Sequence, residues 1–182
     1  MTTLEVKKGL ICIDVGHGGR DPGVVYEGIK EKDIVYEIAE KISTLTHRPL
    51  LLTRRRDVFL PLRKRVEVAN RNDACFFLSL HCNAVPDRLA KGIEAWYFSD
   101  TGKRLAELFL DRLFHFATVN RGAKKGRFFV LRKTGCPAVL LGLGFLSNEE
   151  DRYRLVDPDW QRLVSIKIAK VLDELCALAI GR

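Results

Sequence analysis

Apolar segments of two kinds alternate along the chain, and this alternation most strongly limits its fold. Short apolar runs typical of buried strands occupy residues 10–15, 49–53, 75–80, 92–98, 127–132 and 137–144. Apolar residues spaced as on one face of a helix occupy residues 32–45, 62–69, 105–116 and 157–178. The order strand, helix, strand predicts an α/β fold: one sheet of about six strands, mostly parallel or mixed, flanked by helices.

The length and composition fit a single domain over residues 1–182, with its core at about 10–178. A chain of 182 residues with 47% hydrophobic and 30% charged residues can bury a core of ordinary size. No apolar run approaches the roughly 20 residues of a membrane span. Asp14 interrupts the N-terminal apolar run and no small-residue cleavage site follows, so a strand is expected there and not a signal peptide.

The formal net charge of +8 indicates which kinds of partner suit the surface. Basic residues cluster at 54–56, 63–65, 124–127 and 132–133. Such a surplus suits an anionic partner, such as nucleic acid, anionic lipid or an anionic cell-wall polymer. The alternative is a solvated surface that keeps the protein in solution, and no nucleic-acid-binding motif accompanies the charge.

Two histidines and a glutamate stand where a parallel sheet places its ligands, beyond the carboxyl ends of strands. His17 lies in a glycine-rich loop after the first predicted strand, His81 ends the third, and Glu31 begins the first long helix. Two histidines and one carboxylate form the ligand set of a hydrolytic zinc site. The alternatives are structural histidines, a glutamate favoured by the helix dipole, and a phosphate-binding loop, although the loop lacks P-loop residues.

A glycine interrupts the last predicted strand. Residues 137–148 have the sequence PAVLLGLGFLSN, with Gly142 inside the apolar run. Glycine weakens a strand because it has no side chain to pack and loses the most freedom on folding. Gly142 therefore suggests a bend, the close approach of another backbone, or a side chain that is missing.

Eight short motifs occur in the order that is typical of one known enzyme family. They are IDVGHGGRDPG, GIKEKD, LLTRRRD, LRKRVEVAN, LSLHCNA, GIEAWYF, NRGAKKGRFFVLRKT and PAVLLGLGFLSNEED. Through them the chain, from about residue 10 to 178, resembles the zinc-dependent N-acetylmuramoyl-L-alanine amidases of the Amidase_3 type. The resemblance implies cleavage of the amide between the lactyl group of N-acetylmuramic acid and the L-alanine of the peptide stem. It also implies one zinc ion held by His17, Glu31 and His81.

Two further polar residues are candidates for roles beside these ligands. Asp14 is a candidate to orient a metal-bound histidine, and the alternative is a strand-end residue that caps a turn. Asn83 is a candidate to line the substrate cleft, and its alternative is an Asx turn.

The resemblance also gives Gly142 a meaning, because the family's catalytic glutamate falls on this position while the flanking residues fit. Glu94, in GIEAWYF, is the candidate substitute for proton transfer, with an ordinary strand residue as the alternative. Three hypotheses follow: an amidase that is slow or uses another group, a zinc-containing peptidoglycan-binding protein without turnover, and a normal enzyme altered at this position. We place the amidase first because all three ligands are present. A basic nucleic-acid-binding α/β protein is a more distant alternative.

The same resemblance predicts the protein's setting. Peptidoglycan is the expected partner, anionic wall polymers suit the positive charge, nucleic acid is not expected, and a monomer is favoured. The expected place of action is the bacterial cell wall, in the periplasm or outside the cell. Without a signal peptide, we expect release as for phage lysins, release by a mother cell, or a domain cut from a longer protein. No wall-binding domain and no inserted autoinhibitory segment are expected, which predicts an open groove.

Overall fold

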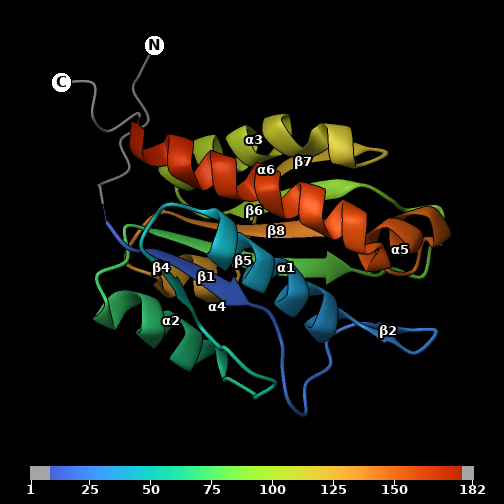
Figure 1. The fold of residues 1–182 in the computed structure, drawn as a ribbon, viewed down its shortest axis with the longest axis horizontal. Helices are drawn as coiled ribbons and strands as arrows, with labels where there is room; N and C mark the ends of the chain where they lie inside the picture. Colours follow the sequence, from blue (N-terminus) through green and yellow to red (C-terminus); the bar gives the residue numbers. More distant parts are fainter. Residues whose placement is uncertain (1–8, 178–182) are drawn as a thin grey trace.

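A six-stranded mixed sheet forms the centre of the fold, as the sequence predicts (Figure 1). The computed structural model describes residues 9–177, and the strand order is β4–β1–β5–β8–β6–β7. These strands are β1 (Ile11–Val15), β4 (Leu50–Leu52), β5 (Phe76–Asn83), β6 (Ile93–Tyr97), β7 (Asn120–Lys125) and β8 (Ala138–Phe145). Strand β6 runs antiparallel to β8, whereas the other neighbouring pairs are parallel.

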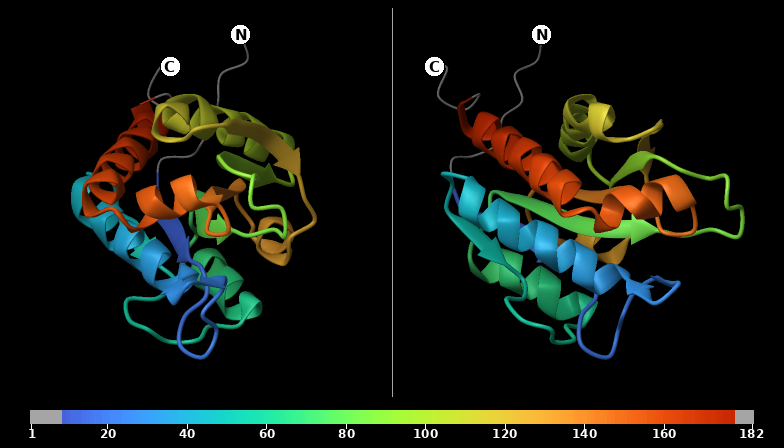
Figure 2. Two further views of the ribbon diagram at one scale, coloured as in Figure 1. Left: turned by 90° about the vertical axis from the view of Figure 1, so that its right-hand side faces the viewer. Right: turned by 45° about the vertical axis from the view of Figure 1, so that its right-hand side comes forward.

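Helices cover both faces of the sheet, but unequally (Figure 2). The larger apolar core joins one face to α1 (Glu31–Leu45), α3 (Asp100–Leu113) and α6 (Pro158–Ala177). The smaller core joins the other face to α2 (Leu62–Arg71) and to the short α4 (Phe129–Lys133). The remaining elements are the hairpin β2 (Val25–Tyr26) and β3 (Ile29–Lys30), the short η1 (Phe114–Phe116) and α5 (Glu149–Val156), which follows β8.

The alternation of side chains along each strand sorts the sheet into an apolar face and a partly polar face. On β5, Phe76, Leu78 and Leu80 belong to the larger core, so Ser79 and His81 point to the face that α2 and α4 cover. Asp14, Asn83, Gly142 and Glu94 occupy alternate positions of the same kind on their strands. The small helical layer therefore lies over the residues that carry the chemistry.

The predicted strand at residues 127–132 is wrong. Residues 129–133 form α4, because Val130 and Leu131 pack into the smaller core beside α2. The strand lies just upstream as β7, whose sequence NRGAKK is partly exposed at the edge of the sheet and lacks an apolar pattern. The hairpin β2–β3 and helix α5 were not predicted. Residue 178, the predicted end of the last helix, lies outside the described residues.

Within residues 9–177, none of the helices combines the length and the apolar character needed to cross a bilayer.

Candidate metal centre

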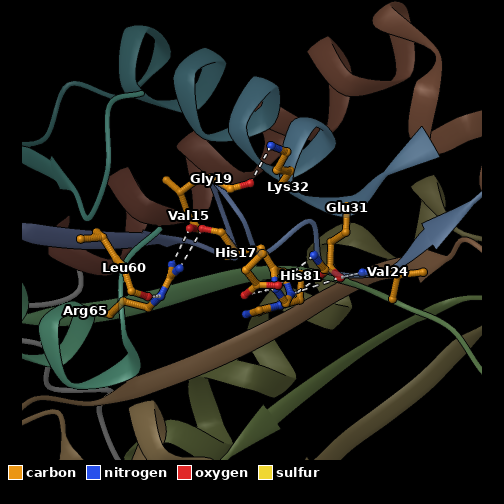
Figure 3. Close-up of polar contacts among 12 residues, drawn as sticks. Val15, His17, Gly19, Val24, Glu31, Lys32, Leu60, Arg65 and His81 are labelled. Atoms are coloured by element: carbon orange, nitrogen blue, oxygen red, sulfur yellow. Dashed lines mark hydrogen bonds and ion pairs between the residues drawn. The ribbon is translucent and has the colours of Figure 1, made fainter. Parts of the chain in front are cut away.

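Three elements that are distant in sequence bring His17, Glu31 and His81 together (Figure 3). His17 lies in the loop after β1, Glu31 is the first residue of α1, and His81 lies near the end of β5. Nε2 of His17 is 3.2 Å from Oε2 of Glu31, and Nδ1 of His81 is 2.9 Å from Oε1 of Glu31. One ligand atom from each residue lies within 4.8 Å of the others. The structure thus assembles the predicted triad.

The donor set and its burial fit a metal ion such as zinc. Glu31 is 2% exposed, and its two carboxylate oxygens also accept hydrogen bonds from the backbone N–H groups of Val24 and Cys82, both at 2.9 Å. Burial acts to raise the pKa of the Glu31 carboxyl, but hydrogen bonds from His17 and His81 outweigh it and hold that pKa well below its usual range. Two nitrogens and one carboxylate are a set that zinc accepts, with a fourth position left open.

A second carboxylate, which the sequence analysis missed, orients His17. Nδ1 of His17 lies 2.9 Å from Oδ2 of Asp21, and this contact leaves Nε2 facing Glu31. Burial acts to lower the pKa of His17, but the hydrogen bonds and charges of Glu31 and Asp21 outweigh it and raise that pKa. Metal-binding histidines usually donate their second ring N–H to such a partner. The only sequence signal was the position of Asp21, four residues after His17 in the motif IDVGHGGRDPG.

Two buried arginines hold the backbone of the His17 loop. His17 itself has a left-handed backbone, with φ of 58°. Arg65 donates to the carbonyl oxygens of Val15 at 2.6 Å and of His17 at 2.7 Å, while Arg54 donates to that of Gly16 at 3.1 Å. Burial and the nearby Arg65 charge lower the pKa of Arg54. Arg54 and Arg65 belong to two of the basic clusters, so their charge serves the interior and not an anionic partner.

Asp14 does not take the role that the sequence analysis considered first. Its carboxylate accepts hydrogen bonds from Thr53 at 2.9 Å, from Arg65 at 2.9 Å and from Ser79 at 2.7 Å. None of its hydrogen bonds within residues 9–177 goes to a histidine ring. Asp14 is linked to His17 through Arg65, which also binds the His17 carbonyl.

The triad opens into a pocket of about 320 Å³ between the sheet and helices α2 and α4. Its lining includes the three candidate ligands and Arg65. It also includes Asn83, Glu94, Trp96, Phe128 and Phe129. The predicted cleft residue Asn83 and the predicted substitute Glu94 therefore share one pocket with the candidate metal ligands.

Gly142 gives up its side-chain space to Asn83. Strand β8 runs unbroken through Gly142, which pairs with His81 on one side and Glu94 on the other. A Cβ atom added at Gly142 would lie 2.5 Å from Nδ2 of Asn83. The space at Gly142 is therefore filled by the side chain of Asn83, and not by another backbone, which was one of the three meanings that the sequence left open.

Glu94 is a buried carboxylate directly across the sheet from Gly142. Its Oε1 accepts hydrogen bonds from Asn83 at 3.2 Å and Trp96 at 3.0 Å, and its Oε2 accepts from Arg121 at 3.3 Å and Lys124 at 2.5 Å. Burial acts to raise the pKa of Glu94, but these donors, led by Lys124, lower it overall. The pocket thus contains an ionised carboxylate one strand away from the glycine.

Comparisons with known proteins agree with this arrangement. A family model described as N-acetylmuramoyl-L-alanine amidase matches residues 11–174. The endolysin of Bacillus phage SPP1 is 39% identical over 155 residues, which are 78% of this chain and 56% of the endolysin. The N-acetylmuramoyl-L-alanine amidase LytC of Bacillus subtilis (strain 168) is 33% identical over 153 residues, covering 80% of this chain and 31% of LytC.

A solved structure has the same fold over nearly its whole length. It is the catalytic domain of CwlV, an N-acetylmuramoyl-L-alanine amidase from Bacillus (Paenibacillus) polymyxa var. colistinus, with a TM-score of 0.88 and 32% identity. The match covers 93% of this chain and 99% of that domain. The chain therefore spans 56% and 31% of the endolysin and of LytC, but nearly all of a solved catalytic domain.

We expect Asp21→Asn to weaken zinc binding by about 10–100-fold, because His17 loses the charged partner that fixes its ring. The affinity is measured by competition with a chromogenic chelator. Asp33→Asn is the control, since Asp33 is exposed on the first turn of α1 and carries the same charge. Equal weakening by both substitutions would show that net charge, and not the orientation of His17, governs the affinity.

Proposed function

The chain belongs to the N-acetylmuramoyl-L-alanine amidase family, and on this premise we propose that it hydrolyses the amide between N-acetylmuramic acid and L-alanine in peptidoglycan. We propose that His17, Glu31 and His81 hold one zinc ion for this reaction. The observation that carries the proposal is the pocket in which these three ligands and the carboxylate of Glu94 lie together.

Zinc bound at this site would polarise the scissile carbonyl and lower the pKa of a water at the open fourth position. Side chains of the protein itself align the ligands and transfer the proton. Asp21 and Glu31 keep the ring of His17 aligned, and Arg65 holds its backbone. Glu94 accepts a proton from the attacking water and passes it to the departing amine nitrogen of L-alanine.

The neighbours of Glu94 predict a slow enzyme. Lys124 and Arg121 both bind Oε2, and they favour the ionised form of the carboxylate. A carboxylate with a lowered pKa is ionised at neutral pH but accepts protons weakly, so its contribution as a general base is reduced. The same ion pairs favour the second candidate function, a zinc-containing peptidoglycan-binding protein in which Glu94 is structural and no turnover occurs.

The proposed setting follows from the proposed substrate. Peptidoglycan places the protein at the bacterial cell wall, and an endolysin is among the relatives. Arg54 and Arg65 are buried and do not face a partner. The basic residues that are exposed would favour binding to anionic wall polymers. The placing of the two histidines at a candidate metal site supports the wall substrate over the nucleic-acid alternative, which treats them as structural.

We expect Glu94→Gln to lower the rate of peptide release from purified peptidoglycan by about 10²–10⁴-fold, because the amide cannot accept the proton. The zinc-loaded protein is assayed by labelling new L-alanine amino termini. Glu107→Gln is the control, since Glu107 is exposed on α3. Release that is equally fast in both variants would remove Glu94 from the mechanism. Binding to peptidoglycan without any release by the unchanged protein would establish the second candidate function.

We expect Gly142→Ala to destabilise the protein by about 1–3 kcal/mol and to slow peptide release, because the new methyl group displaces Asn83 from Glu94. Denaturant unfolding measures the first effect. Gly135→Ala is the matched control, because a Cβ there would lie 3.5 Å from its nearest neighbour. Combining Gly142→Ala with Asn83→Ala should recover most of the lost stability. Strictly additive losses would show that Asn83 does not occupy the space of Gly142.

A further inference from the structure

A second and larger pocket lies at the same end of the sheet, between the hairpin β2–β3 and helix α5. We call it the Tyr26 pocket, and its volume is about 650 Å³. The residues that matter for its chemistry are Tyr26, Glu27, Arg88, Ser147, Glu149 and Arg152. None of the roles argued above uses this pocket.

Short stretches of chain connect the Tyr26 pocket to the metal centre. Val24 donates its backbone N–H to Glu31, and Tyr26 lies two residues further along, within about 7 Å of extended chain. On the other side, the backbone N–H of Leu146 donates to the carbonyl of Asn83 at 2.8 Å, and the next residue is Ser147. The Tyr26 pocket therefore adjoins the metal centre, since Tyr26 and Ser147 lie within two residues of backbone groups that bind Glu31 and Asn83.

Two arginines and an aromatic ring give the pocket its chemistry. Arg88 and Arg152 both lie over the ring of Tyr26, at 5.8 Å and 4.7 Å from its centroid. Arg152 is already engaged, because it pairs with Glu27 at 3.0 Å and donates to the carbonyl of Leu146 at 3.0 Å. The positive charge of Arg152 is therefore largely neutralised by groups of the protein itself.

Arg88 differs, because its guanidinium makes no ion pair with any carboxylate in the described part of the chain. Its backbone is fixed by Asn148, whose side-chain N–H donates to the Arg88 carbonyl at 2.8 Å. Glu149, the other carboxylate of the pocket, is not an ion-pair partner of Arg88 either. Arg88 is exposed and lines the pocket, and an unpaired guanidinium has donors available for a carboxylate.

We infer that the Tyr26 pocket binds a free carboxylate of the peptide stem, with Arg88 as its ligand, on the amine side of the scissile bond. This inference rests on the proposed function, because it takes peptidoglycan as the substrate. The sugar side of the substrate is neutral near the cleaved amide, and the pocket that holds the ligands has aromatic walls, Trp96, Phe128 and Phe129. The acidic side is the stem, and the unpaired cation lines the neighbouring Tyr26 pocket.

Calorimetric titration with two peptides tests the inference without requiring turnover. One probe is L-Ala-γ-D-Glu-L-Lys, and the other is the same peptide with the α-carboxyl of D-glutamate amidated. We expect the acid to bind about three- to tenfold more tightly than the amide. Arg88→Gln should abolish this difference. Arg112→Gln, at a partly exposed arginine of α3 that does not line the pocket, should leave it unchanged.

Equal affinity of the unchanged protein for the two peptides would overturn the inference, as would an unchanged preference in Arg88→Gln. Glycerol phosphate is titrated as a third probe. If Arg88→Gln weakens glycerol phosphate and not the peptide, the pocket serves an anionic wall polymer and the inference is wrong. Because these are binding measurements, failure of the proposed activity shows separately, as absence of peptide release while the carboxylate preference persists.

Discussion

The ion pair between Arg65 and Asp14 is the interaction on which the candidate centre depends. Both side chains are almost fully buried, 2.9 Å apart, and Arg65 uses its remaining donors on the carbonyl oxygens of Val15, His17 and Leu60. Buried ion pairs often add little net stability, because both charges lose their hydration. Here the pair fixes geometry: it joins β1, α2 and the loop that carries His17. Removing either partner would leave an unpaired buried charge next to the loop that carries His17.

The register of the sheet brings three of the positions discussed above into one row. His81, Gly142 and Glu94 are direct partners on β5, β8 and β6, so their side-chain positions form one row on one face. Neighbouring strands lie about 4.8 Å apart. The carboxylate of Glu94 on β6 is therefore displaced by one strand spacing from the β8 position on which, by the family resemblance, the catalytic glutamate is expected to fall. Asn83 occupies the space above Gly142 and donates to Glu94, so its side chain connects the glycine on β8 with the carboxylate on β6.

The sequence predicted those features that local pattern determines. Apolar runs and helix spacing gave the mixed six-stranded sheet, and strand ends gave the position of the triad. The strand at 127–132 was wrong because Val130 and Leu131 are apolar to fill the smaller core, while β7 is a polar edge strand. Asp21 was missed because its role depends on the conformation of the loop. That Asn83 fills the space of Gly142 depends on tertiary contacts that spacing does not encode.

The most direct test of the central claim is a crystal structure of the zinc-loaded protein with anomalous data at the zinc edge. The claim is that this end of the sheet is a metal centre whose acid–base carboxylate lies on the neighbouring strand. It predicts one peak bonded to His17, Glu31 and His81 at about 2.0–2.2 Å, with Glu94 beside Asn83 and facing the open position. A peak on other residues, or Glu94 turned away from the metal, would contradict the account.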